Sequence, residues 1–263
     1  GNSNTKKGLA TPAFLRVLMN SEQQEQAWLL EDLRSEDSTP VEARIALANW
    51  LTDDQKGAGH LLARVMVNRL WQHHFGVGIV ATPSDFGNQG SRPTHPELLD
   101  YLAARLIEGG WRLKPIHRLI LTSAVYLQSG ETNARATEVD PENQFLWRQR
   151  SRRMEAEIIR DNLLAVSGVL DKSMFGPGSL KETDGRRSIY LKVKRSSLIP
   201  ILQLFDAPDA IQSIGHRDVT TVPPQALAMM NSPLIRQYAE KLAARIRAEG
   251  ATEPASVVQA AYE

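Results

Sequence analysis

The sequence contains no cysteine. This absence excludes disulfide bonds, thiolate metal sites, a cysteine nucleophile and covalent attachment of a c-type haem within these residues. An excess of one charge is also lacking, because 31 Lys and Arg balance 30 Asp and Glu and leave a formal net charge of +1. The balanced charge provides no overall attraction to nucleic acid, and we expect no nucleic-acid partner.

Long apolar runs are absent as well. The longest stretch without a charged residue, 219–235, contains three prolines and therefore cannot form a membrane-spanning helix. Glycine and proline number only 17 and 14, which excludes a collagen-like chain, while hydrophobic residues at 42% are enough for a sizeable core. The chain begins at Gly1 without an initiator methionine or a signal-peptide pattern. We expect it to be a fragment of a longer protein.

Helix start and stop signals recur along the chain and predict a mainly α protein. Cap residues followed by proline or by a Glu or Gln three positions later occur at Ser21, Thr39, Thr94, Asp140 and Ser232. Together with apolar periodicity, they predict helices over residues 40–51, 61–75, 97–108, 114–128, 140–147, 154–170 and 233–246.

The intervening segments indicate loops and very little β structure. Residues 188–194 alternate like a strand, whereas 76–93, 128–139 and 171–187 are rich in loop-forming residues. No internal repeat or linker divides the chain. We therefore expect one compact multi-helix domain over 1–263, with long loops, at most a short β element near 186–195, and an N-terminal segment, 1–38, packed on it.

The first candidate site lies within residues 68–97. Three imidazoles and two carboxylates in this segment suit a hydrolytic metal centre or an acid–base pair, and they belong to His73, His74, Asp85, His95 and Glu97. No spacing typical of metal ligands supports that interpretation. Histidines in the last turn of a helix also complement its dipole, and Glu97 fits a capping box. We favour these structural roles and expect no metal and no other cofactor.

Two basic clusters are the other candidates. The first alternates charges over 148–161, where Arg153, Glu157 and Arg160 suit either an anion-binding site or an ion-pair network; we favour the network. The second surrounds Tyr190 and contains Arg186, Arg187, Lys192, Lys194 and Arg195. It suits a phosphate or sulfate ester, but an edge strand protected by basic residues gives the same pattern. Nucleotide-binding and serine-hydrolase motifs are absent.

Four collinear blocks carry a family resemblance. The blocks are residues 64–103, 140–171, 186–209 and 220–234. The first contains the sequence RVMVNRLWQHHFGVGIV, and the last contains TTVPPQALAMMNSPL. These blocks resemble the signature of a large planctomycete and verrucomicrobial domain family of unknown function. The resemblance implies the C-terminal part of a large exported protein, in a periplasm-like or cell-envelope location, that often also carries a cytochrome-c-like domain. It implies no catalytic residue.

Three functions remain open at this point. We favour a non-catalytic interaction or scaffold domain whose partners are other domains of the same parent protein, so that this domain alone is not expected to be an enzyme. One alternative is a binding module or hydrolase for polysaccharides, anionic sulfated ones among them, that uses the Arg and Lys clusters with Trp71, Trp147 and Tyr190. The other is a metal-dependent enzyme centred on His73, His74, Asp85 and His95. The candidate binding residues are His74, Asp85, His95, Arg153, Glu157, Arg160, Arg186 and Arg187.

Overall fold

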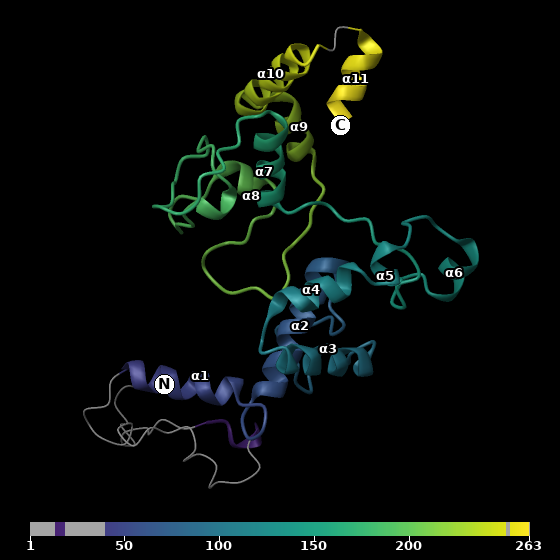
Figure 1. Ribbon diagram of the computed structural model, residues 1–263, viewed down its shortest axis with the longest axis vertical. Helices are drawn as coiled ribbons and strands as arrows, with labels where there is room; N and C mark the ends of the chain where they lie inside the picture. The colour runs from purple at the N-terminus through teal and green to yellow at the C-terminus, as the bar shows by residue number, and fades with distance from the viewer. Residues whose placement is uncertain (1–13, 19–39, 251–252, 263) are drawn as a thin grey trace. The chain divides into compact units, whose positions relative to one another are not determined.

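The computed structural model describes residues 14–18, 40–250 and 253–262 of the chain. The prediction of a mainly α protein is confirmed, and the β structure among these residues is limited to isolated bridges. The chain divides into two compact units, unit 1 over Gly1–Ser151 and unit 2 over Arg152–Glu263. Figure 1 labels the helices of both. The single domain over 1–263 stays a prediction.

The N-terminal segment is described only in part. Residues 14–18 include the 3-10 helix Arg16–Leu18, and the Phe14 ring stacks on Trp50 with 5.4 Å between ring centroids. Leu18, like Phe14, packs against the cluster of the buried residues Trp50 and Ala58. The remainder of 1–38, including the helix start predicted at Ser21, lies outside the described residues. The packing of the whole segment 1–38 on the domain stays a prediction.

Unit 1 is built around the long helix α2. The α-helices described in unit 1 are α1 (Pro40–Thr52), α2 (Gly59–Phe75), α3 (Pro96–Glu108), α4 (Leu113–Leu121), α5 (Ala124–Leu127) and α6 (Ala134–Val139). The first three confirm the predictions for 40–51, 61–75 and 97–108. Helix α2 packs on α3 and α4 and ends at Gly76, whose φ of 86° only glycine adopts readily. The core that results contains Ala63, Val67, Leu70, Trp71, Phe75, Ile79, Val80, Leu99, Leu102, Ala103, Leu106, Ile116 and Ile120.

Several helix boundaries in unit 1 differ from the predictions. The helix predicted over 114–128 is interrupted after α4, and the Ser123 hydroxyl caps α5 by accepting from the Tyr126 N–H at 3.2 Å. Part of the loop predicted over 128–139 is helix α6, capped by Asn133. The capping box at Thr94 is wrong, because the N-cap of α3 is His95 and the Thr94 hydroxyl donates to the Ile79 carbonyl. Short polar side chains thus found different backbone partners from those that spacing predicted.

The helix predicted over 140–147 is wrong. Asp140 does cap the segment, because its carboxylate accepts from the N–H groups of Gln144 and Phe145 at 2.9 and 2.8 Å. However, Asn143 and Leu146 have φ of 53° and 55°, which a right-handed helix does not contain. The Trp147 indole then donates to the Asp140 carbonyl at 2.9 Å and closes the segment into a compact turn.

Among the residues described, unit 2 combines six helical segments with two long connections, 167–199 and 205–222. Its elements are α7 (Ala156–Val166), the 3-10 helix η4 (Ser188–Tyr190), α8 (Pro200–Leu204), α9 (Pro223–Asn231), α10 (Pro233–Ala248) and α11 (Pro254–Tyr262). Helix α7 is shorter than the predicted 154–170, and it packs on α8 around Ala156, Ile199, Ile201 and Phe205. In Figure 1 the loop between α7 and α8 extends away from these helices.

The β structure in this loop is minor, as expected. The strand predicted over 188–194 is instead the 3-10 helix η4 followed by irregular chain. Isolated bridges pair Asp171 with Arg186 and Ser179 with Leu191. Within the residues described, no helix combines the length and the apolar character needed to cross a membrane.

Candidate functional site

Arg160 is the most deeply buried charged residue of unit 2, with 1% of its surface exposed. From α7 its guanidinium donates to the carbonyls of Arg186 and Glu182 at 3.0 and 3.2 Å, to the Asp184 carbonyl, and to the Ser188 hydroxyl at 3.2 Å. Burial lowers the pKa of Arg160, since it disfavours the charged form. These bonds hold the 182–188 segment against α7 and leave this side chain engaged with the protein itself.

The side chains of Asp161 and Arg186 also hold the 182–188 segment in place. The Asp161 carboxylate accepts from the N–H and the hydroxyl of Ser188, both at 2.7 Å. It also lies 3.4 Å from the guanidinium of Arg187, which is otherwise exposed. Arg186 forms an ion pair with Asp184 at 3.3 Å, and its hydrogen bonds lower the pKa of that carboxyl group. Asp161 and Asp184 therefore fix the positions of two arginine side chains and of the backbone in the 182–188 segment.

A second polar cluster surrounds Arg153, which precedes α7. Its guanidinium lies 2.5 Å from a carboxylate oxygen of Asp206 and donates to the Thr220 carbonyl and, at 3.1 Å, to the Gln225 side chain. Asp206 in turn accepts from the Thr220 N–H at 2.7 Å. The Gln225 amide donates to the Leu204 carbonyl at 3.0 Å. Three segments distant in sequence are held together by these bonds.

The structure contains ion pairs, as the charge pattern predicted. They join other residues than those that helical spacing would pair. The spacing suggested pairing within one helix, as between Arg153 and Glu157. Because α7 begins only at Ala156, Arg153 lies outside the helix and pairs with Asp206 instead. Glu157 pairs with Arg217 at 2.7 Å, a residue far along the chain. Sequence analysis missed Asp206, Arg217 and Gln225 as partners; the only local signal was the presence of Asp206 and Gln225 in the family blocks.

The unit 1 candidates lie in separate local contacts. His74 Nε2 is 2.8 Å from His117 Nδ1, whereas Asp85 accepts from the Gly87 N–H and His95 lies 2.9 Å from the Thr94 hydroxyl. Within the part of the chain that the structure describes, no three His, Asp or Glu side chains are grouped as metal ligands. The binding roles of all eight candidate residues stay predictions.

The three aromatic residues considered for sugar stacking lie in unequal surroundings. Trp71 is buried in the core of unit 1, 4.3 Å from the Phe75 ring centroid, and presents no face to a ligand. The Arg148 guanidinium lies 5.0 Å from the Trp147 ring centroid. Tyr190 has the Arg186 guanidinium over its ring at 5.1 Å. A sugar face is therefore less available than the sequence suggested.

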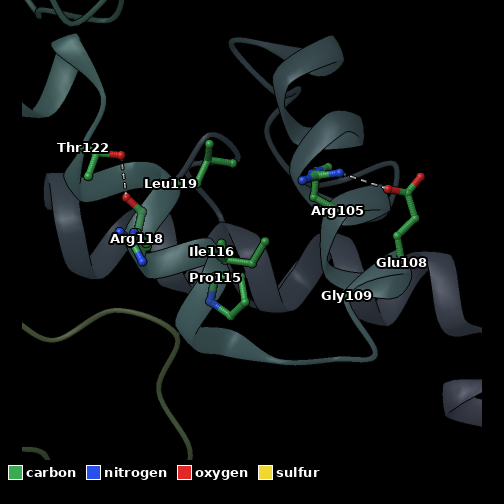
Figure 2. Close-up of a pocket in the computed structure, with 8 residues that line it drawn as sticks. All are labelled: Arg105, Glu108, Gly109, Pro115, Ile116, Arg118, Leu119 and Thr122. Atoms are coloured by element: carbon green, nitrogen blue, oxygen red, sulfur yellow. Dashed lines mark hydrogen bonds and ion pairs between the residues drawn. The ribbon is translucent and has the colours of Figure 1, made fainter.

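One pocket of about 510 Å³ lies between α3 and α4 (Figure 2). None of the eight candidate residues lines it; the lining residues are Arg105, Glu108, Gly109, Pro115, Ile116, Arg118, Leu119 and Thr122. Arg105 and Glu108 form an exposed ion pair at 3.5 Å, and the Thr122 hydroxyl donates to the Arg118 carbonyl at 2.9 Å. The pocket thus offers no pairing of a nucleophile with a general base.

The Arg153–Asp206 contact predicts a pH-dependent stability of unit 2. The Thr220 N–H, and next to it the Arg153 guanidinium, hold the pKa of Asp206 below its ordinary value. A lowered folded-state pKa stabilises the protein above about pH 4 and loses that effect as the pH falls through the folded-state pKa. We expect Asp206→Asn to cost about 1–3 kcal/mol at pH 7 and progressively less toward pH 2.

Urea denaturation at several pH values checks this expectation. Asparagine tolerates the left-handed φ of 62° at this position, so that the backbone can be retained. Asp209→Asn is the control, since Asp209 is exposed and belongs to the same DAPD sequence. A stability difference between wild type and Asp206→Asn that stays constant from pH 7 to pH 2 would contradict the assignment.

Comparison with known proteins shows to which family the chain belongs. No curated protein and no solved structure matches the chain. The model of one protein family, PSD1, described as "Protein of unknown function (DUF1553)", matches residues 43–263. Since the matched region covers far more than half of the sequence, the chain belongs to the PSD1 family of proteins of unknown function.

Proposed function

We propose that this chain is a non-catalytic interaction domain, and that segment 219–231 of unit 2, the docking segment, contacts an apolar surface of another domain of the same parent protein. The observation that carries the proposal is a segment without charged residues whose backbone is fixed while its apolar side chains are exposed. Apolar side chains that are exposed together on a folded protein commonly mark an interaction surface.

Polar groups beneath the docking segment fix its backbone. Asp206 accepts from the N–H and the hydroxyl of Thr220, and Arg153 donates to the Thr220 carbonyl. Gln225 is buried and donates to the Leu204 carbonyl from the first turn of α9. A segment that is already ordered loses little conformational entropy on binding, which favours association.

The exposed side chains define the chemistry of the partner. They are those of Val219, Val222, Leu227, Met229 and Met230. Because no charged residue lies within the docking segment, the segment does not select a polyanion, and its aliphatic and thioether groups suit an apolar protein surface. The buried or paired states of Arg160, Asp161 and Asp206 support a structural rather than a catalytic use of these three residues.

Hydrogen exchange tests the docking segment. We expect backbone amides of 219–231 to exchange at least tenfold more slowly in the full-length parent protein than in the isolated 263-residue chain. The double substitution Leu227→Asp and Met230→Asp should remove that difference without altering exchange in the isolated chain. Leu127→Asp, at a leucine of unit 1 that is 72% exposed, is the control and should leave the difference unchanged. Equal exchange of 219–231 in both proteins would contradict the proposal.

The setting of the parent protein is part of the proposal and rests on the family resemblance. We infer that it is exported to a periplasm-like or envelope location and carries a cytochrome-c-like domain, whose haem lies outside this cysteine-free chain. Cell fractionation and haem staining of the parent protein test both statements; a cytoplasmic protein without covalent haem would refute them.

The other two functions have weaker support. The burial of Trp71 weakens the polysaccharide alternative, and the separation of His74, Asp85 and His95 into different contacts weakens the metal alternative. A glycan array with sulfated polymers and elemental analysis of protein purified without chelator test them.

A further inference from the structure

The loop between α7 and α8 has a strained residue at its tip. Phe175 adopts φ of 70°, in the left-handed region that a non-glycine residue with a bulky side chain rarely occupies. Its N–H donates to the Tyr190 hydroxyl at 3.0 Å, and its carbonyl accepts from Arg186 at 3.2 Å. Arg186 donates as well to the Pro177 carbonyl at 2.9 Å. Three hydrogen bonds therefore hold this part of the loop in a conformation that it would not adopt alone.

The side chains of Met174 and Phe175 are exposed, although the backbone here is strained and hydrogen-bonded. Phe175 is 78% exposed and Met174 is 69% exposed. Burial in a core would stabilise these two side chains, yet the fold holds them outward at a fixed position. Backbone strain retained by surrounding contacts commonly marks a functional position.

The adjoining segment of the loop adds further exposed apolar groups. Backbone hydrogen bonds from Ser179 to Tyr190 at 2.9 Å and from Lys192 to Ser179 at 2.7 Å join the segments 171–181 and 186–195. The side chains of Ile189 and Val193 on the second segment are exposed. We refer to the two joined segments, 171–181 and 186–195, as the basic–apolar loop.

This loop carries an excess of positive charge, whereas the charges of the whole chain nearly cancel. Residues 171–195 contain seven Lys and Arg against three Asp and Glu. The acidic groups are engaged locally: Asp184 pairs with Arg186, Glu182 accepts from the Ile201 N–H at 3.0 Å, and Asp171 accepts from the Ser173 N–H. The exposed basic side chains are Lys172, Lys181, Arg187, Lys192, Lys194 and Arg195.

We propose that the basic–apolar loop binds the surface of an anionic lipid bilayer, with Phe175 and Met174 inserted at the headgroup level and the lysines and arginines on lipid phosphates. A bilayer combines the two kinds of group that the loop presents, a dense negative surface above an apolar layer. A sulfated polymer would use the basic residues but leaves Phe175 without a role. The inference concerns a surface distinct from the docking segment and does not depend on it.

Flotation with lipid vesicles tests the insertion. We expect the 263-residue chain to bind vesicles of three parts phosphatidylcholine and one part phosphatidylglycerol, and pure phosphatidylcholine much more weakly. Phe175→Asn should weaken binding roughly tenfold, because asparagine accepts the left-handed backbone but removes the apolar ring. Phe145→Asn is the matched control: Phe145 is 71% exposed but lies in unit 1, and its loss should leave binding unchanged. Equal flotation of wild type and Phe175→Asn would overturn the proposal.

Charge substitutions distinguish a lipid surface from a soluble polyanion. Lys192→Ala with Lys194→Ala should weaken vesicle binding roughly twentyfold, since each basic residue near an anionic surface contributes roughly a fivefold gain. Lys114→Ala with Lys241→Ala removes the same charge elsewhere and should have little effect. Binding to dextran sulfate that is insensitive to Phe175→Asn, together with no flotation, would overturn the membrane proposal and identify a polyanion site.

Discussion

Arg160→Met is expected to destabilise unit 2 by about 3–5 kcal/mol, a large part of the stability of a small domain. Methionine fills a similar space but donates no hydrogen bond. The carbonyls of Glu182, Asp184 and Arg186 then lose a donor in a buried position, and each such loss costs about 1–3 kcal/mol. The nearby Asp161 carboxylate also loses a positive charge at 3.7 Å. Because Arg160 holds the 182–188 segment on α7, we expect this segment to detach first.

Arg160→Lys should not restore the stability. An ammonium group is a single point of charge, and it cannot reach the several acceptors that surround the planar guanidinium. Arg187→Met is the control, because Arg187 is 68% exposed and its pair with Asp161 at 3.4 Å should contribute at most about 1 kcal/mol.

Urea denaturation followed by hydrogen exchange distinguishes the two units. In Arg160→Met the backbone amides of 152–250 should lose protection at lower urea, while those of 59–121 in unit 1 keep theirs. An unchanged midpoint for unit 2 would show that the buried guanidinium contributes no net stability.

Asn68→Ala is expected to destabilise unit 1 by about 2–4 kcal/mol, since two buried backbone groups lose their only side-chain partner here. Asn68 is fully buried in α2, where its side chain accepts from the Val80 N–H at 2.8 Å and donates to the Val80 carbonyl at 3.0 Å. This pair of bonds fixes the chain that returns from α2 toward α3. Gly78 approaches the same amide so closely that an added Cβ would lie 2.6 Å from Asn68 Nδ2.

Asn68→Asp should be at least as harmful, because it retains the acceptor but loses the donor and places a carboxylate in the core. Asn88→Ala, at an exposed asparagine of the same unit, should change the stability by less than about 0.5 kcal/mol. Thermal denaturation of the three variants measures these differences. Similar melting temperatures for Asn68→Ala and Asn88→Ala would contradict the role assigned to Asn68.

The candidate site was only partly predictable from the sequence. The charge pattern over 148–161 correctly indicated an ion-pair network, because arginines and carboxylates at such density usually neutralise each other. The individual partners were not predictable, since helical spacing describes only residues within one helix and Arg153 precedes α7. Asp206 and Arg217 approach through the folding of segments more than fifty residues away, which no local spacing encodes.

The sequence by itself determined the helical class, the positions of α1, α2, α3 and α10, and the absence of any thiol chemistry. Proline at the first helical position, terminating glycine and 3.6-residue periodicity act within one or two turns, so that they can be recognised without the fold. The tertiary structure alone decided which charges are buried, that the 140–147 segment is a turn, and that Phe175 is held outward. Those outcomes depend on which distant backbone groups meet a side chain, because burial and hydrogen-bond partners are properties of the packed chain.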